Sequence, residues 1–166
     1  MVPSVLFTLR TETLSHHKGE VCFPGGMVDG NIDGSIVDTA VREMMEEVGI
    51  GFDAGSDAGS KGNYYPKAQR REVLGILRCD WSELMTITGV AVTPVVGYLG
   101  DIVDIHTELT PNPDEVTEAF TVPLRDLADH TKWVYRDFAL PVFTGGPHVV
   151  WGLTAYITQR FLEKVY

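Results

Sequence analysis

The sequence predicts an α+β fold in which a mixed β-sheet is sandwiched between α-helices. Short runs rich in β-forming residues recur along the chain, and two other segments space their apolar residues three or four positions apart, as amphipathic helices do. Strands and helices do not alternate strictly, which favours a mixed sheet flanked by helices. The chain has 166 residues and 44% of them are hydrophobic, so residues 1–166 are expected to form a single domain.

The first part of the chain predicts a strand, a glycine-rich turn and a helix. Residues 5–11 are rich in β-formers, and a short apolar segment at residues 21–23 stops at the Pro-Gly-Gly of residues 24–26. Ser35 is suited to cap the start of a helix that Gly49 would end.

The second part predicts an insertion, several strands and a C-terminal helix. Residues 51–70 are dominated by Gly, Ser and Asp, which indicates a flexible surface insertion within the domain. Leu153, Ile157 and Phe161 recur every four residues, as in an amphipathic helix. Between these two segments we expect strands at residues 72–78 and 90–99 and an extended piece within residues 114–122. A short helix at residues 124–129 and a hairpin strand at residues 135–143 are expected to follow.

The composition restricts the partners and the compartment. A formal net charge of -10 repels nucleic-acid backbones, so no nucleic-acid binding is expected. The apolar runs are too short to span a membrane, and the N-terminus shows no secretory signal. Cys22 and Cys79 are interpreted as two reduced thiols of an intracellular protein, with cytosol, mitochondrion and peroxisome all left open.

The helix that follows Ser35 carries the strongest functional signal. Glu43, Glu46 and Glu47 are spaced so that they share one helical face, and the opposite face is expected to pack into the core through Val37, Val41, Met44, Met45 and Val48. Like charges at this spacing repel by a few tenths of a kcal/mol per pair (order of magnitude). A divalent cation with oxygen ligands would offset that repulsion. Taken alone, the three glutamates favour a solvated acidic face over a metal site.

This helix resembles the signature of the Nudix hydrolases, G-x5-E-x7-R-E-U-x-E-E-x-G-U, in which U is aliphatic. Gly26 matches its first glycine, and residues 42–50 match its second half. The residue eight before Arg42 is Gly34 instead of Glu, and the spacing from Gly26 is longer than in the signature. Three nearby carboxylates are candidates to replace that Glu as the partner of Arg42: Asp29, Asp33 and Asp38.

A second resemblance is to the coenzyme A pyrophosphatase branch, whose signature reads approximately L-L-T-x-R-[SA]-x3-R-x3-G-x3-F-P-G-G. Residues 6–11, Gly19 and residues 23–26 fit its spacing, and Ser15 stands where the second Arg is expected. Residues 92–97, 111–116 and 150–155 also resemble this branch. The resemblance implies a strand before Val5, so we expect that N-terminal strand to be missing. The free sheet edge would favour a homodimer.

The resemblance implies hydrolysis of the diphosphate of coenzyme A or acyl-CoA, giving 3′,5′-ADP and (acyl-)4′-phosphopantetheine, with Mg²⁺ or Mn²⁺ as cofactor. The expected metal site consists of Glu43, Glu47, the Gly26 carbonyl and Glu115. Glu46 and Arg42 are the expected catalytic residues: Glu46 orients or deprotonates the water, and Arg42 holds a glutamate or a loop Asp in place. Arg10, Lys18 and Gly25 are expected to bind the substrate. Two alternatives stay open: a Nudix hydrolase of ADP-ribose, dinucleotides or modified nucleoside triphosphates, and a catalytically impaired binding module.

Overall fold

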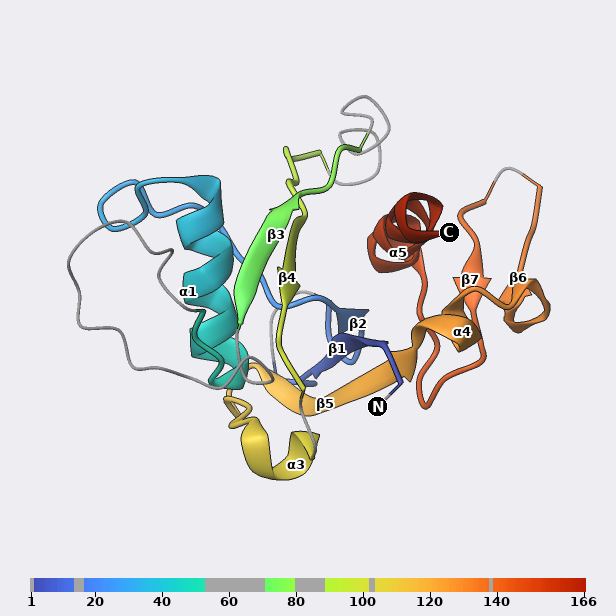
Figure 1. Ribbon diagram of the computed structural model, residues 1–166, viewed down its shortest axis with the longest axis horizontal. Coiled ribbons are helices and arrows are strands. Elements are labelled where there is room, and N and C mark those ends of the chain that lie inside the picture. Colours follow the sequence, from blue (N-terminus) through green and yellow to red (C-terminus); the bar gives the residue numbers. More distant parts are fainter. Residues whose placement is uncertain (1, 14–16, 53–70, 80–88, 102–103, 138) are drawn as a thin grey trace.

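The computed structural model describes residues 2–13, 17–52, 71–79, 89–101, 104–137 and 139–166 (Figure 1). Within them the helices are α1 (Ile36–Val48), α3 (Ile105–Glu108), α4 (Leu124–Leu127) and α5 (Gly152–Val165). The strands are β1 (Ser4–Arg10), β2 (Val21–Cys22), β3 (Glu72–Ile76), β4 (Val95–Tyr98), β5 (Val116–Pro123), β6 (Trp133–Val134) and β7 (Val142–Phe143). The predicted α+β class is confirmed.

The strands form three antiparallel sheets in these residues. The largest has the order β2-β1-β5, and the other two are the pairs β3-β4 and β6-β7. A mixed sheet was predicted, but no parallel pair occurs in the described ranges. Both edges of β1 are already used by antiparallel partners, and a bulge between Val73 and Gly75 distorts β3.

The sheet β2-β1-β5 carries apolar side chains on both faces, because successive residues of β1 point to opposite sides. On one face, Leu6 packs with Val48 at the end of α1. On the other face, Phe7 packs in a cluster that includes Ala155 of α5. Figure 1 shows α1 and α5 on opposite sides of the strands. The expected position of the sheet between helices is therefore confirmed.

Helix α1 begins and ends where the sequence predicts. The Ser35 hydroxyl accepts a hydrogen bond from the Asp38 amide at 3.2 Å, which satisfies one of the free N–H groups of the first turn. Gly49 has φ 76°, the left-handed conformation, and its amide donates to the Met45 carbonyl. This geometry fixes the end of α1 beside the acidic residues.

Some predicted elements differ in extent. The strand expected at residues 90–99 begins only at Val95, because Pro94 has no amide hydrogen for a ladder. The single strand expected at residues 135–143 is replaced by two short ones: β6 ends just before residue 135, and β7 occupies the last two residues of the expected range. Helix α3 was not predicted; the Asp104 side chain caps it. Most of the insertion expected at residues 51–70 lies outside the described residues. The helices described here are all too short or too polar to cross a membrane.

Candidate active site

Arg42 connects the acidic face of α1 with the loop that precedes the helix. Its Nε and one Nη donate to the two carboxylate oxygens of Asp33 at 3.0 and 2.9 Å. The other Nη donates to Glu43 at 2.7 Å and to Glu46 at 3.2 Å. The Met27 carbonyl accepts a further bond from Arg42 at 3.2 Å. The guanidinium therefore holds two glutamates and the loop in one arrangement.

Asp33, and neither of the other two candidates, is the carboxylate that pairs with Arg42. The Asp33 side chain is only 2% exposed, and one of its oxygens also accepts bonds from the Thr39 hydroxyl and the Asp29 amide. The Arg42 hydrogen bonds are the main reason that the pKa of Asp33 lies well below its usual range. Asp38 instead contacts the Ser35 cap.

Glu47 is the most deeply buried carboxylate of the helix, with 1% of the residue exposed. One carboxylate oxygen accepts a bond from the Gly25 amide at 3.1 Å, and the other has no hydrogen-bond partner. Burial raises the pKa of Glu47 to about 7; the charges of Glu115 and Glu43 add to this rise, and Gly25 and Arg10 oppose it. A buried carboxylate oxygen without a partner is costly unless a proton or a cation compensates it.

The two faces of α1 therefore differ from those expected. Glu47 does not lie on a solvated face, and Met45, which was expected in the core, is 56% exposed. The reason is tertiary: the turn at residues 24–26 lies against the side of the helix that carries Glu47. Val48 and Met44 do pack into the core.

Gly26 lies directly against the carboxylate of Glu43. A Cβ atom placed on Gly26 would overlap both oxygens of that carboxylate, so this position tolerates no side chain unless Glu43 moves. The turn at residues 24–26 thus contacts α1 twice, through Gly25 at Glu47 and through Gly26 at Glu43.

Glu115 reaches the same region because the segment before β5 is attached to the end of α1. The Thr110 amide donates to the Val48 carbonyl at 3.0 Å, and the Asn112 amide donates to the Glu47 carbonyl at 2.8 Å. The Asn112 side chain contacts Glu115 at 3.4 Å. The negative charge of Glu115 contributes to the raised pKa of Glu47.

The remaining expected site residues are less closely held. Arg10, at the end of β1, has a buried Nε without a hydrogen-bond partner, and its charge acts on Glu47. Lys18 is exposed between β1 and β2, and it forms no hydrogen bond or ion pair with the carboxylates among the residues described. The Glu46 side chain is 52% exposed and accepts the bond from Arg42. The structure thus brings together Arg10, Gly25, Gly26, Arg42, Glu43, Glu46, Glu47 and Glu115.

These side chains supply the oxygen donors that a hard divalent cation prefers. Within the described ranges, no three His, Cys, Asp or Glu side chains are already grouped as a metal-ligand set. The ion pair between Glu43 and Arg42 occupies one of the candidate ligands. The unpartnered oxygen of Glu47 is nevertheless a buried anionic donor, which fits such a cation.

Comparisons with known proteins identify the family of this chain. The NUDIX domain model matches residues 3–140. The human and mouse proteins named mitochondrial coenzyme A diphosphatase NUDT8 are 36% and 34% identical, over 98% of this chain. The chain covers 63% and 70% of their lengths. An uncharacterised Nudix hydrolase, NudL, from Photorhabdus laumondii is 34% identical over 98% of this chain and 78% of its own length. The resemblance to the coenzyme A pyrophosphatase branch is thereby confirmed, and this chain belongs to the Nudix hydrolase family.

Proposed function

We propose that this Nudix hydrolase cleaves the diphosphate of coenzyme A or acyl-CoA into 3′,5′-ADP and (acyl-)4′-phosphopantetheine, in the presence of Mg²⁺ or Mn²⁺. The names of the human and mouse relatives support this substrate. The chain spans less than two thirds of the human relative's length. The activity in that relative's name is therefore only proposed for this chain.

The proposal depends on the buried carboxylate of Glu47 beside the turn at residues 24–26. One of its oxygens accepts a hydrogen bond from Gly25, and the other has no hydrogen-bond partner. Glu47 and Glu43 would hold the cation, with the Gly26 carbonyl and Glu115 as further oxygen ligands. A bound divalent ion neutralises diphosphate charge and lowers the pKa of water. Arg42 keeps Glu43 in position through its bonds to both Glu43 and Asp33.

The other residues act on the water and on the substrate. Glu46 is half exposed, so its carboxylate is accessible to orient a water molecule or accept its proton. Arg10 and Lys18 provide positive charge for the phosphates, and the Gly25 backbone borders the space proposed for the diphosphate. Water adds to one phosphorus, and the bond from that phosphorus to the bridging oxygen breaks as the other phosphate leaves.

A substrate panel tests the proposal. The purified chain is incubated with coenzyme A, an acyl-CoA and ADP-ribose, each with Mg²⁺, with Mn²⁺ and with a chelator, and the products are separated by chromatography. Release of 3′,5′-ADP from coenzyme A, abolished by the chelator, is the expected result. Turnover of ADP-ribose with coenzyme A untouched would assign the chain to the alternative substrates. Binding without turnover of any of the three would favour the impaired module.

A further inference from the structure

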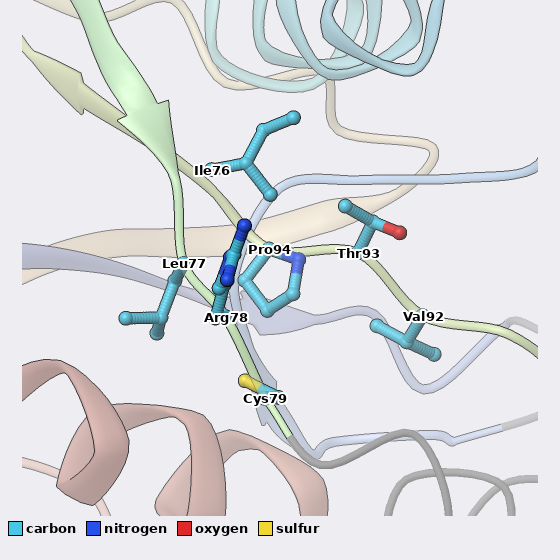
Figure 2. A pocket seen from close by; sticks show the side chains of 7 residues that line it. All are labelled: Ile76, Leu77, Arg78, Cys79, Val92, Thr93 and Pro94. Carbon is cyan, nitrogen blue, oxygen red and sulfur yellow. The ribbon is translucent and has the colours of Figure 1, made fainter.

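A pocket of about 400 Å³ lies where β3 ends and β4 begins (Figure 2). Its walls are residues 76–79 and residues 92–94. The Leu77 amide donates to the Pro94 carbonyl at 2.9 Å, so the two walls are joined by the continuing strand pairing. The volume lies within the range of small-molecule sites, roughly 300–1,000 Å³.

The lining combines apolar side chains with one cation. Ile76, Val92 and Pro94 provide apolar surface, and Arg78 is the only ionisable cation among the seven lining residues. Figure 2 shows Arg78 extending back toward Ile76, whereas Leu77 points to the other side of the strand. Leu77 packs there against α5. Arg78 itself is exposed, and none of the carboxylates in the described ranges forms an ion pair with it.

The pocket and the candidate active site are connected by the short segment of residues 23–25. Phe23 packs against the same buried cluster as Cys79 and Val92, two residues that line the pocket. Two residues later, the Gly25 amide binds Glu47. Two residues of extended chain span at most about 7 Å. A substrate with its diphosphate beside Gly25 can therefore extend one of its arms into the pocket.

We infer that the pocket binds the adenosine arm of the substrate, with the base against the apolar walls and Arg78 on the 3′-phosphate. This inference rests on the proposed function, because it names how that substrate is recognised. The diphosphate is assigned to the carboxylate site, so Arg78 meets another anionic group. Coenzyme A carries one, the phosphate on the ribose, and the guanidinium geometry suits it. The pantetheine and acyl arm carries no charge for Arg78 to bind.

The same residue would make the chain selective within its substrate class. ADP-ribose and unphosphorylated dinucleotides lack the ribose phosphate, so they would leave Arg78 without a partner. Dephospho-coenzyme A differs from coenzyme A only by that phosphate, which makes the two a matched pair of ligands. Arg78 is therefore assigned as a specificity-determining residue.

The test compares kcat/KM for coenzyme A and for dephospho-coenzyme A in the wild type, Arg78→Leu and Arg78→Lys. The wild type is expected to prefer coenzyme A by about tenfold or more, the usual size of a hydrogen bond to a charged group. Arg78→Leu should abolish the preference, and Arg78→Lys should keep part of it because the charge remains without the bidentate geometry. Arg125→Leu removes an exposed arginine in α4 and controls for loss of general positive charge. It should leave the preference unchanged.

A binding measurement separates this inference from the proposed function. Calorimetry with adenosine 3′,5′-bisphosphate and with 5′-AMP needs no turnover, and the wild type should bind the bisphosphate about tenfold more tightly. Arg78→Leu should bind the two equally. Equal binding by the wild type, or a preference that survives Arg78→Leu, overturns the role of Arg78 even if coenzyme A is hydrolysed. Preferential binding that depends on Arg78 supports it even if hydrolysis fails.

Discussion

The two oxygens of Asp33 accept bonds from Arg42 at 3.0 and 2.9 Å, and this pair joins the loop before α1 to the acidic face of the helix. Arg42 in turn donates to Glu43 at 2.7 Å, so the position of one proposed metal ligand depends on Asp33 through a single intervening side chain. Asp33 lies nine residues before Arg42, one more than the eight that the Nudix signature prescribes for its glutamate.

Asp33→Asn should lower kcat/KM about 10- to 100-fold, as is usual when a partner that orients a metal ligand is lost. The amide keeps the size of the side chain but removes the charge and one acceptor for the guanidinium. Steady-state kinetics with a titration of Mg²⁺ measures the effect. The variant should also need a higher Mg²⁺ concentration for half-maximal activity. Asp33→Glu restores the charge and should recover part of the activity.

Asp38→Asn is the matched control for that variant. Asp38 lies on the same stretch of chain, is exposed and contacts Ser35 instead of Arg42. Its activity should stay near that of the wild type. A similar loss in both variants would show that general charge, and not the bond to Arg42, explains the effect of Asp33.

Gly26→Ala should reduce activity about tenfold or more, because the added methyl group overlaps the Glu43 carboxylate and displaces it. Misplacing a catalytic group by about 1 Å can cost roughly 100-fold. Gly30→Ala is the control, since a Cβ there meets no atom within 4 Å. Circular dichroism and thermal melting should show both variants folded. Wild-type activity in Gly26→Ala would remove Glu43 from the proposed site.

Local chemistry made some features of the fold predictable. Helix α1 begins at a serine cap and ends at a left-handed glycine, and each of these residues bonds only to a residue three or four positions away. Helix α3 escaped prediction because four residues carry too little periodicity, although Asp104 before it is a suitable cap.

The burial of Glu47 could not be read from the helix, because it depends on a turn more than 20 residues earlier in the chain. Hydrophobic patterning places charged residues outside by default, and only tertiary packing shows that residues 24–26 cover this one. The choice of Asp33 among three carboxylates was equally out of reach, since loop geometry decides it. Thr39, whose role no sequence motif indicates, also donates a hydrogen bond that helps to fix Asp33.

Glu46→Gln should lower kcat about 100-fold or more if Glu46 orients or deprotonates the water, the usual range for general base catalysis. The amide is nearly isosteric and cannot accept a proton from water. Glu46 is half exposed, so the folded structure should be unaffected. Glu163→Gln in α5 provides a control at another exposed glutamate with an arginine partner. Equal activity in wild type and Glu46→Gln would exclude this role.

Gly49→Ala should destabilise the fold by at least about 1–2 kcal/mol, the cost of placing an L-residue in the left-handed conformation. The new methyl group would also meet the Thr110 side chain. Gly51→Ala, where a Cβ has open space and φ is not positive, should change stability by less than about 0.5 kcal/mol. Urea denaturation of both variants measures the difference. Equal midpoints would contradict the role of Gly49 in ending the helix.

The stability of the metal-free chain should fall with rising pH because of Glu47. The pKa of Glu47 is about 7 in the folded chain, above its ordinary value of 4.5, so the folded state holds the proton more tightly than the unfolded state does. The stabilising contribution is complete below pH 4.5 and is lost as the pH rises through 7. Thermal melting with a chelator between pH 5 and 8 measures this loss, and Glu47→Gln should show a smaller fall over the same range because the amide does not titrate.

Mg²⁺ should reverse this trend if Glu47 is a metal ligand. The ion binds the carboxylate and not the acid, so its stabilising effect should be larger at pH 8 than at pH 5.5, and its binding should release protons near pH 6.5. Calorimetry in two buffers of different ionisation enthalpy counts those protons. Glu47→Gln should bind Mg²⁺ more weakly and release fewer protons. Proton release that is identical in the variant would assign it to another group and leave Glu47 outside the metal site.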